Sequence, residues 1–198
     1  PRINSSLTDK CKSGQKQNCY SMVTTTQRLF IEPLSPNHRE AFFGYRSDSE
    51  TNQYQGWIPT SLEDADAFIS KRPLEFNTPE SWFQLGLFLK ESEQLIGDVG
   101  VHFIGDENSQ VEIGYTLAKQ FHGKGFATEA VQQVIKVLFE RYGKHRIVAR
   151  IDPENTSSIE LVQRLEFRQE AHFRKTYLSD GIWRDELVFG LLKSENTK

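Results

Sequence analysis

Apolar and polar residues alternate along several stretches of this chain with the period of a strand. The stretch "RLFIEPL" (28–34) alternates and closes near a proline, which predicts a strand. Four apolar stretches predict further strands: "SWFQLGLFLKE", "EQLIGDVGVHFIGD", "SQVEIGYTLAK" and "HRIVARID". Near the end, "RQEAHFRKTYL" and "IWRDELVFGLL" are joined by the turn "SDG", and together they predict an antiparallel hairpin.

Four other segments predict helices from their start signals and spacing. In "SPNHREAFFGYRSD", Ser35 stands at an N-cap position and a proline follows it. "TSLEDADAFISKR" can be capped by Thr60 or Ser61 and has acidic residues in its first turn. Over residues 127–142 apolar side chains recur every three or four positions, and Gly143 ends that pattern. "NTSSIELVQRLEF" predicts a short fourth helix.

These elements follow one another without an internal repeat or a linker, over a chain of 198 residues. This length suits one domain with a substantial core and is short for two. We therefore predict a single α/β (α+β) domain over residues 22–198, with a mostly antiparallel sheet. Residues 1–21 are polar, and Met22 is the one methionine of the chain. We take Met22 as the natural start and residues 1–21 as an extension that is not native; the alternative is a genuine polar arm.

Composition and charge narrow the classes of function. Aromatic residues make up 12% of the chain and charged residues 26%, which is typical of globular proteins. No apolar run approaches the roughly 18–20 residues of a membrane-spanning helix. The net charge of −3 lacks the basic excess typical of nucleic-acid binding. The acidic excess lies in residues 29–198, where it favours cationic substrates or simply serves solubility.

Cysteine and histidine positions exclude two kinds of chemistry. Cys11 and Cys19 both lie in the polar extension, so acyl transfer in the domain would not use a cysteinyl intermediate. The five histidines are dispersed without H-x-x-x-H spacing, and we expect no metal site. The extension lacks the apolar stretch of a signal peptide, so we expect a cytoplasmic protein.

A glycine-rich loop, "QFHGKGFATEAV" (120–131), leads straight into the third predicted helix. Such a turn presents free backbone N–H groups at the positive end of the helix dipole, an arrangement that binds phosphate. Lys124 adds charge and Thr128 adds a hydroxyl. A dinucleotide fingerprint needs a third glycine where Thr128 stands, and a Walker loop needs Ser or Thr where Gly125 stands. Taken alone, the loop is equally well explained as a structural turn.

The spacing Gln120-x-x-Gly123-x-Gly125 matches the Q/R-x-x-G-x-G/A motif of the GCN5-related N-acetyltransferases (GNAT). Over residues 24–193 the chain resembles the RimJ/RimL branch of that family, in "TTTQRLFIEPLS", "QGWIPTSLEDADAFI", "LIGDVGV", "VEIGYTLAKQFHGKGFATEAV", "KHRIVARIDPENTSSIELVQRLEF" and "DGIWRDELVFGLL". The resemblance implies the GNAT fold: a central, mostly antiparallel mixed sheet of about seven strands, splayed between the fourth and fifth, with about four helices. Glu166 stands where the branch usually has glycine, so either Glu166 adopts glycine's backbone conformation or that turn differs.

The resemblance also implies acetyl-CoA as co-substrate, bound without a metal. The loop would hold its pyrophosphate through Gln120, His122, Gly123, Lys124, Gly125, Phe126, Ala127 and Thr128. The strand "EIGYTL", with the bulge that splays the sheet in this family, would bind the pantetheine arm at Tyr115, Thr116 and Leu117. Asn155 matches the asparagine that bonds this arm, although it is also a natural helix N-cap and could do both. Ser158 would lie near the thioester sulfur.

The reaction implied is direct transfer of acetyl from the thioester to a primary amine. Glu112 is the candidate base and Asp98 the reserve; the alternative for Glu112 is an ordinary strand residue facing solvent. Ser158, or else Tyr177, is the candidate acid, although these could be an ordinary helix residue and an ordinary strand aromatic. An α-amine, with a reference pKa of about 7.7–8, needs less help from a base than a lysine at about 10.4.

Trp57, Trp183 and Asp185 lie in segments that border the acceptor site in this branch, and they are the candidate substrate-binding residues. Trp57 could instead be a hydrophobic anchor. We expect the acceptor to be a protein N-terminal amine, as in ribosomal-protein acetylation by the branch. The alternatives are a small amine (an amino acid, a polyamine or an antibiotic) or a non-catalytic acyl-CoA-binding module. A homodimer is a further expectation from the branch, and neither nucleic acid nor membrane is expected as a partner.

Overall fold

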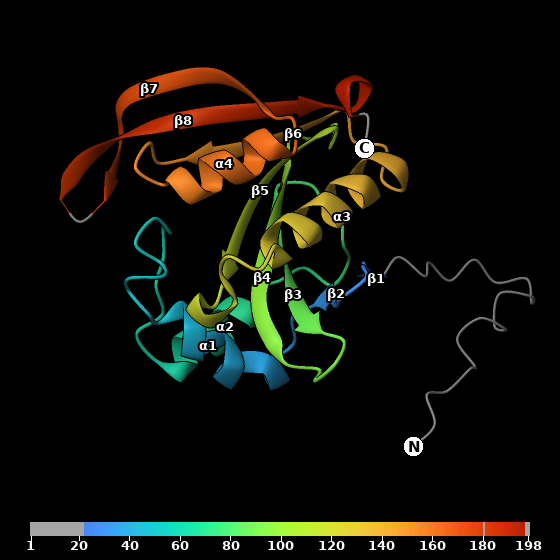
Figure 1. The fold of residues 1–198 in the computed structure, drawn as a ribbon, viewed down its shortest axis with the longest axis vertical. Coiled ribbons are helices and arrows are strands. Elements are labelled where there is room, and N and C mark those ends of the chain that lie inside the picture. The colour runs from blue at the N-terminus through green and yellow to red at the C-terminus, as the bar shows by residue number, and fades with distance from the viewer. Residues whose placement is uncertain (1–21, 180, 197–198) are drawn as a thin grey trace, which may run out of the picture.

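One mixed sheet crosses the computed structural model, which describes residues 22–179 and 181–196 (Figure 1). The eight strands of this described part run in the order β1-β2-β3-β4-β5-β6-β8-β7, antiparallel except for the pair β5 and β6. Their bounds are β1 (Thr24–Thr25), β2 (Leu29–Pro33), β3 (Ser81–Leu89), β4 (Leu95–Ile104), β5 (Gln110–Leu117), β6 (Arg146–Ile151), β7 (Arg168–Ser179) and β8 (Ile182–Leu192). The predicted α+β class and sheet type are confirmed. The predictions for residues 1–21 lie outside the described residues.

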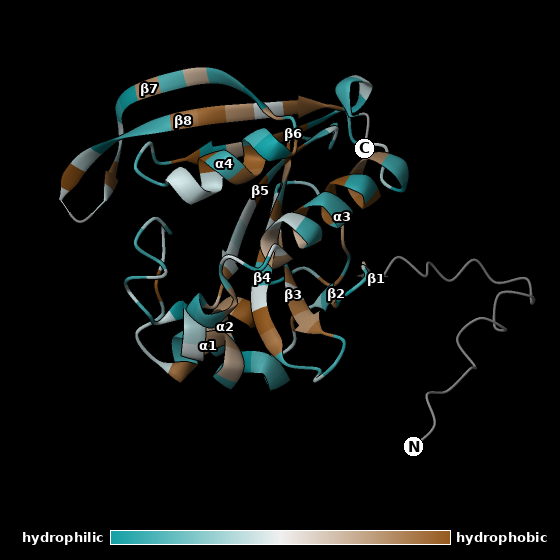
Figure 2. Ribbon diagram, in the orientation of Figure 1, coloured by the Kyte–Doolittle hydropathy of each residue, from teal (hydrophilic) through white to brown (hydrophobic). Residues whose placement is uncertain are grey.

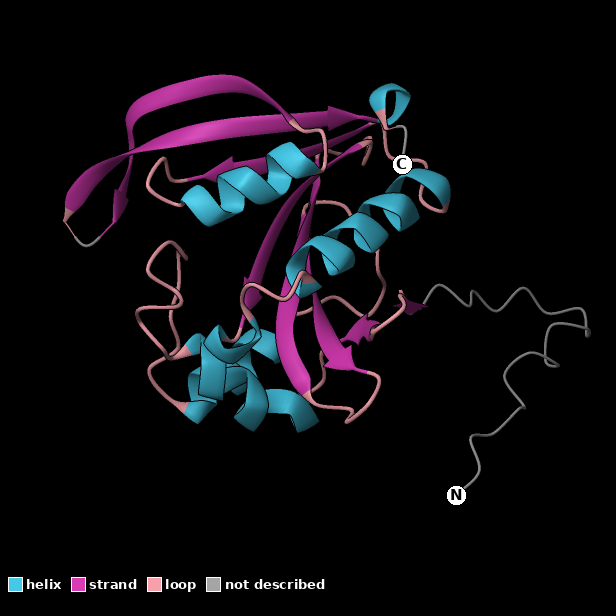
Figure 3. Ribbon diagram, viewed as in Figure 1, coloured by secondary structure: helices cyan, strands magenta, loops and turns pink. Residues whose placement is uncertain are grey.

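The four predicted helical segments are all helices in the structure (Figure 3). The first starts later than predicted, with His38 as its N-cap, and Ser35 caps the short 3-10 turn before it. They are α1 (Arg39–Arg46), α2 (Leu62–Ser70), α3 (Phe126–Glu140) and α4 (Thr156–Arg164), with short 3-10 turns η2 (Pro36–His38), η3 (Lys119–Phe121) and η4 (Lys193–Glu195). Ser61 rather than Thr60 caps α2, because its hydroxyl accepts a hydrogen bond from the Asp64 N–H at 3.1 Å. None of the described helices is both long enough and apolar enough to cross a bilayer.

Alternating side chains of the strands send two apolar clusters to opposite faces of the sheet. Phe83, Leu85 and Leu87 of β3 belong to the larger cluster, together with the inner sides of α3 and α4. Phe88, next along the same strand, belongs to a smaller cluster with residues of α1 and α2. The period of two in a strand produces this division. Figure 2 shows β3 as mostly hydrophobic, as expected for a strand that is buried on both faces.

The short pairing of β5 with β6 opens the sheet. The two strands pair only from Gln110 to Glu112; beyond that point β5 continues beside β4, and β6 continues beside β8. The predicted splay is therefore confirmed, here between the fifth and sixth strands because the two-residue β1 adds one strand at the edge. The expected bulge in β5 is wrong for its pairing with β4, which keeps one uninterrupted register. The opening comes from lost pairing rather than from an inserted residue.

Glu166 keeps the turn that glycine makes in the resembling branch. Its φ is 69°, in the left-handed region. Its N–H bonds the Gln163 carbonyl, and the Phe167 N–H bonds the Val162 carbonyl, both at 3.0 Å. This is the Schellman pattern that closes a helix, and Phe167 and Val162 belong to the same buried cluster, as the motif requires. The chain thus keeps the turn at the cost of backbone strain at Glu166.

We predict that Glu166→Gly raises the free energy of unfolding by about 0.5–1 kcal/mol, measured by urea denaturation. Relief of left-handed strain, roughly 1–2 kcal/mol, outweighs the greater entropy of glycine in the unfolded chain. Glu166→Ala is the control, because alanine keeps the Cβ and therefore the strain. Equal stability of the glycine and alanine variants would contradict this account.

Candidate active site

A cleft of about 640 Å³ opens where β5 and β6 separate. Its lining comes from three parts of the chain: residues 50–55 between α1 and α2, residues 115–128 around the glycine loop, and residues 155–164 along α4. Beyond Glu112, the edge of β5 that faces away from β4 pairs with none of the described strands, and it faces this opening. Such an edge can bind an extended ligand through strand-like backbone hydrogen bonds.

The glycine loop takes a conformation that requires glycine. Gly123 and Gly125 have φ of 73° and 78°. A Cβ would meet nothing within 4 Å at Gly123 and only Arg28 Nη2, at 3.5 Å, at Gly125, so backbone conformation rather than space makes glycine necessary. Gly125 is the N-cap residue of α3, and His122 closes the loop by donating from Nε2 to the Leu117 carbonyl at 2.7 Å. The loop and the positive end of α3 together suit an anion.

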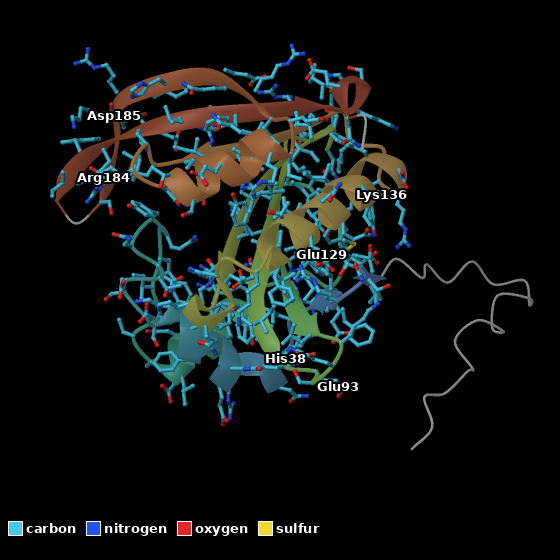
Figure 4. The ribbon with its side chains drawn as sticks, in the orientation of Figure 1. His38, Glu93, Glu129, Lys136, Arg184 and Asp185 are labelled. Carbon is cyan, nitrogen blue, oxygen red and sulfur yellow. The ribbon has the colours of Figure 1, made fainter. Side chains whose placement is uncertain are left out.

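Glu129, labelled in Figure 4, anchors the start of α3 to the N-terminal strands. Its carboxylate accepts hydrogen bonds from Thr26 Oγ1 (2.5 Å), Arg28 N (2.9 Å) and Arg28 Nε (2.6 Å). Arg28 also donates to the Lys124 carbonyl at 2.9 Å, and its guanidinium lies 4.2 Å from the centroid of the Phe126 ring. Burial alone would raise the pKa of Glu129, but these hydrogen bonds outweigh burial and lower it. Arg28 thereby holds positive charge beside the glycine loop.

Most of the residues predicted to bind the coenzyme line the cleft. They are Tyr115, Thr116, Leu117, His122, Gly123, Gly125, Phe126, Ala127, Thr128, Asn155 and Ser158. The exceptions are Gln120 and Lys124, which are exposed. The Lys124 ammonium lies 5.4 Å from the centroid of the Phe121 ring. The predicted segment therefore does form the wall of a cleft, although two of its residues stand outside the lining.

Two polar side chains of the cleft are suited to a ligand. Thr116 Oγ1 is buried and has no hydrogen-bond partner among the described residues, which is unusual for a hydroxyl. Asn155 caps α4, because its Oδ1 accepts the Ser158 N–H at 3.2 Å. The cap uses only the oxygen of this amide, so its N–H groups can serve a ligand.

Tyr115 donates to the Ser158 carbonyl at 3.3 Å and so joins β5 to α4; burial raises its pKa to about 12.

Glu112 lies at the apex of the opening, as the last residue of β5 that pairs with β6. Its carboxylate accepts a hydrogen bond from Arg150 Nε at 3.3 Å, and Arg150 also bonds Glu186 at 2.7 Å. Burial raises the pKa of Glu112, and the charge of Arg150 offsets part of that rise. Across the sheet its register partner is His102, whose ring stacks on the half-exposed Trp82 at 4.8 Å. Glu112 does not line the cleft itself.

Asp98, the reserve base, is completely buried and lies outside the cleft lining. Its carboxylate accepts hydrogen bonds from Tyr45 Oη (2.5 Å) and from Arg46 Nε (3.0 Å) and Nη2 (2.5 Å). Arg46 continues to Gln55 Oε1 at 3.2 Å, and Gln55 Nε2 donates to the Tyr115 carbonyl at 3.3 Å. A chain of hydrogen bonds thus runs from Asp98 through Arg46 and Gln55 to the open edge of β5.

Trp57 holds the loop over the cleft rather than lining the cleft. Its ring stacks on Phe68 with centroids 4.7 Å apart and planes 9° apart, and Phe68 stacks on Phe42 at 5.5 Å. Residues 50–55, just before it, do line the cleft. The ring contacts therefore support the hydrophobic-anchor interpretation of Trp57.

Three predicted site residues come from the β7–β8 hairpin, and none of them lines the cleft. Tyr177 donates from its hydroxyl to Asp152 Oδ2 at 2.8 Å. Asp185 accepts the Lys175 N–H at 3.0 Å. Trp183 is 55% exposed, close to the hairpin turn. The hairpin therefore reaches the site through the β6–α4 turn that contains Asp152.

Among the lining residues that were not predicted from the sequence, Arg164 and Gln55 make the contacts that matter most for the shape of the cleft. Arg164, on α4, lines it and donates to Thr128 Oγ1 at 3.2 Å, across to α3. It also lines an adjoining hollow of about 500 Å³ on the other side of Gly125. Its position nine residues after Asn155 on the same helix is the one signal that could have indicated it. Nothing in the sequence marks Gln55, since its place depends on the buried ion pair beneath it.

Comparison with known proteins agrees with this geometry. The acetyltransferase (GNAT) domain family matches residues 28–168. "Uncharacterized N-acetyltransferase p20" of Bacillus licheniformis is 33% identical over 174 residues, which is 86% of this chain and 96% of that protein. The ribosomal protein uS5-alanine N-acetyltransferase of Escherichia coli (strain K12) is 30% identical over 118 residues, 59% of this chain and 61% of that one. A crystal structure of a GNAT-family acetyltransferase from Bacillus anthracis has a TM-score of 0.80 at 28% identity, covering 88% of this chain and all of the other.

These matches, with the splayed sheet and its cleft, define an acetyltransferase that acts on nitrogen. The chain belongs to the GNAT family of acetyltransferases, as its glycine loop indicated.

We predict that Glu129→Gln lowers the free energy of unfolding by about 1–2 kcal/mol at neutral pH, because Arg28 and Thr26 lose a charged acceptor. The folded-state pKa of Glu129 is below its ordinary 4.5, so its contribution is present above pH 4.5 and is lost as the pH falls further. Urea denaturation over a pH series should show the difference from the wild type closing in acid.

Glu140→Gln, an exposed carboxylate in the last turn of the same helix, is the matched control and should change stability by less than about 0.5 kcal/mol. A difference at Glu129 that stayed constant in acid would mean that its charge does not anchor the loop.

Proposed function

We propose that the cleft binds acetyl-CoA and that the enzyme acetylates the α-amine of a protein N-terminus. One observation carries the coenzyme assignment: the left-handed Gly123 and Gly125 and the open edge of β5 border the same cleft. The glycines, at the start of α3, suit a pyrophosphate. The open edge suits the pantetheine arm, whose amides can pair with it as a strand would. A nucleotide without that arm would use only the first of these features.

Further groups of the cleft would complete coenzyme binding. The Thr116 hydroxyl, which has no partner among the described residues, and the amide N–H groups of Asn155, which its cap does not use, would be donors for the pantetheine arm. Arg28 and Arg164 bring positive charge to either side of the glycine loop, where phosphates would lie. Gln120 and Lys124 stay in this proposal as groups that reach the phosphates from the solvent side, with His122, Phe126, Ala127 and Thr128 shaping the loop.

The transfer joins the amine nitrogen to the carbonyl carbon of the thioester and breaks the carbon–sulfur bond. The attacking amine has to be neutral, and Glu112 is the group that would take its proton, directly or through water. Burial raises the pKa of Glu112, which makes it a better base than an exposed carboxylate. A backbone N–H on the open edge of β5 would polarise the thioester carbonyl.

Ser158 is the proposed donor to the leaving thiolate. It lines the cleft in the first turn of α4, three residues after the N-cap Asn155. The positive end of a helix stabilises a thiolate, so the leaving group needs little further acid.

The acceptor assignment draws on chemistry and on similarity. An α-amine suits a modest carboxylate base because its pKa is near 8. The similar enzyme of Escherichia coli is named as an alanine N-acetyltransferase of ribosomal protein uS5. A ribosomal acceptor would place the enzyme in the cytoplasm. Trp57, Trp183 and Asp185 remain candidates for the acceptor side, Trp57 through the loop that it anchors.

We predict that acetyl-CoA raises the melting temperature by a few degrees, whereas ATP and NAD at the same concentration do not. A ligand at a hundredfold excess over its Kd adds about 2.7 kcal/mol to the free energy of unfolding. Differential scanning fluorimetry measures the shift. No shift with acetyl-CoA, or an equal one with ATP or NAD, would contradict the coenzyme assignment.

Two glycines that flank α3 provide a matched pair of variants for this experiment. Gly125 and Gly143 lie at opposite ends of the helix, with φ of 78° and 63°. Alanine costs similar backbone strain at both positions, about 1–2 kcal/mol. Gly125→Ala should reduce the acetyl-CoA shift, whereas Gly143→Ala should lower the melting temperature and leave the shift intact.

We predict that Glu112→Gln lowers kcat/KM by roughly 10²–10⁴-fold and removes the lower of two acidic limbs in its pH profile, because the upper one comes from protonation of the acceptor amine. Arg150→Met should move the lower acidic limb of the wild-type profile to higher pH, because the arginine charge holds the Glu112 pKa down. Glu186→Gln should move it to lower pH, because the Glu186 charge raises that pKa.

The profiles are measured with a peptide that begins with alanine and, in parallel, with spermidine as a small amine. Faster turnover of spermidine would overturn the N-terminal acceptor and leave the acetyltransferase chemistry in place. Limbs that did not move in opposite directions would exclude Glu112 as the base.

A further inference from the structure

Asp152 organises the turn between β6 and α4. Its side chain is only 4% exposed. Its Oδ1 accepts the Glu154 N–H at 2.8 Å, and its backbone carbonyl accepts the Asn155 N–H at 2.9 Å. These two bonds fix the turn that delivers Asn155 to its place as N-cap of α4 and lining residue of the cleft. A carboxylate this deeply buried needs further hydrogen bonds, because its desolvation is costly.

Tyr177 of β7 supplies one of those bonds, with its hydroxyl 2.8 Å from Asp152 Oδ2. Arg184 of β8 assists from the same hairpin, since its Nη1 lies 3.4 Å from Glu154 Oε2 and 3.9 Å from Asp152 Oδ2. The Tyr177 proton is therefore directed at Asp152, and the tyrosine is not part of the cleft lining. Burial and the Asp152 carboxylate raise the pKa of Tyr177 well above its ordinary value.

An irregularity in β7 aims Tyr177 at this turn. Between Phe173 and Tyr177, β7 advances four residues while β8 advances only two, from Glu186 to Arg184. Within that bulge Lys175 has a left-handed φ of 51°. A bulge bends its strand and re-aims the side chains that follow it.

Asp185 holds the bulge in place from β8. Its Oδ1 accepts the Lys175 N–H at 3.0 Å, and its Oδ2 lies 2.8 Å from His172 Nε2. Figure 4 labels Asp185 and its neighbour Arg184 on the hairpin. One line of contacts thus runs from Asp185 through the bulge to Tyr177, on to Asp152, and by the turn to Asn155.

We propose that Tyr177 is a positioning residue of the coenzyme site: acting through Asp152, it holds Asn155 against the coenzyme, and Asp185 fixes the bulge that aims it. The inference rests on the proposed binding of acetyl-CoA in the cleft. In this inference Tyr177 affects the affinity for the coenzyme indirectly, and it does not donate a proton in the reaction. The inference also gives Asp185 a part in the reaction that needs no contact with the acceptor.

The test measures, in Tyr177→Phe, the affinity for CoA and the rate of the chemical step separately. The Kd for CoA, measured by isothermal titration calorimetry, should rise about 3- to 10-fold, the effect expected for one hydrogen bond. The kcat at saturating acetyl-CoA should change by less than about twofold, and the basic limb of its pH profile should stay in place. Ile182→Thr, an exposed residue at the hairpin turn, is the control and should leave Kd unchanged.

A double variant tests the route of the effect. If Tyr177 acts through Asn155, Tyr177→Phe should raise Kd less in an Asn155→Ala background than in the wild type. Additive losses would overturn the route. Asp185→Asn loosens the bulge without touching the turn, and it should raise Kd in the same direction by a smaller factor. If Tyr177→Phe is poorly folded, the Kd of Asp185→Asn is measured in its place.

A proton donor gives the opposite pattern in Tyr177→Phe, with kcat lower by about 100-fold or more and Kd unchanged. That result overturns the inference, and so does a variant with both constants unchanged. Failure of the wild type to bind CoA would contradict the proposed function itself. Binding by the wild type and equal binding by Tyr177→Phe would contradict only the role assigned to Tyr177.

Discussion

The separation of β5 from β6 after Glu112 is the constraint on which the rest of the structure depends. Two strands cannot hydrogen-bond each other and also hold a ligand between them. Here each strand keeps a different neighbour, β4 for one and β8 for the other, so each stays paired along one edge. The opposite edges carry backbone groups that need other partners. Gln55 satisfies one of them at the Tyr115 carbonyl.

Contacts outside the cleft determine its shape. The buried pair of Arg46 and Asp98 joins α1 to β4, and Arg46 places Gln55 on the open strand. Such a pair is expensive to bury, but here the carboxylate has hydrogen bonds from several donors, and the pair fixes a single geometry. The Glu129 carboxylate likewise fixes the start of α3 by accepting hydrogen bonds, and the Asp152 carboxylate fixes the turn before α4. Three buried or half-buried carboxylates thus position the three segments that line the cleft.

The coenzyme side of the site could be predicted from the sequence more fully than the catalytic side. The glycine loop and the helix start that follows it are contiguous, and so are Asn155 and Ser158, so their spacing already places them together. The surroundings of Glu112 could not be predicted, because its partner Arg150 lies 38 residues away on a strand whose register decides the contact. The direction in which the Tyr177 side chain points depends on a bulge, and no local sequence pattern in β7 predicts that bulge.

By itself, the sequence determined the longer strands, the four helices, the Asn155 cap and the family, because period, caps and glycine spacing are properties of neighbouring residues. Even Glu166 was recognisable as a residue in glycine's place, although only the structure shows that it adopts glycine's conformation. Tertiary structure alone decided that β5 carries no bulge against β4, that Asp98 is buried beneath Arg46, and that Arg164 meets Thr128. Each of those outcomes depends on which strands become neighbours and in what register, and therefore on residues tens of positions apart.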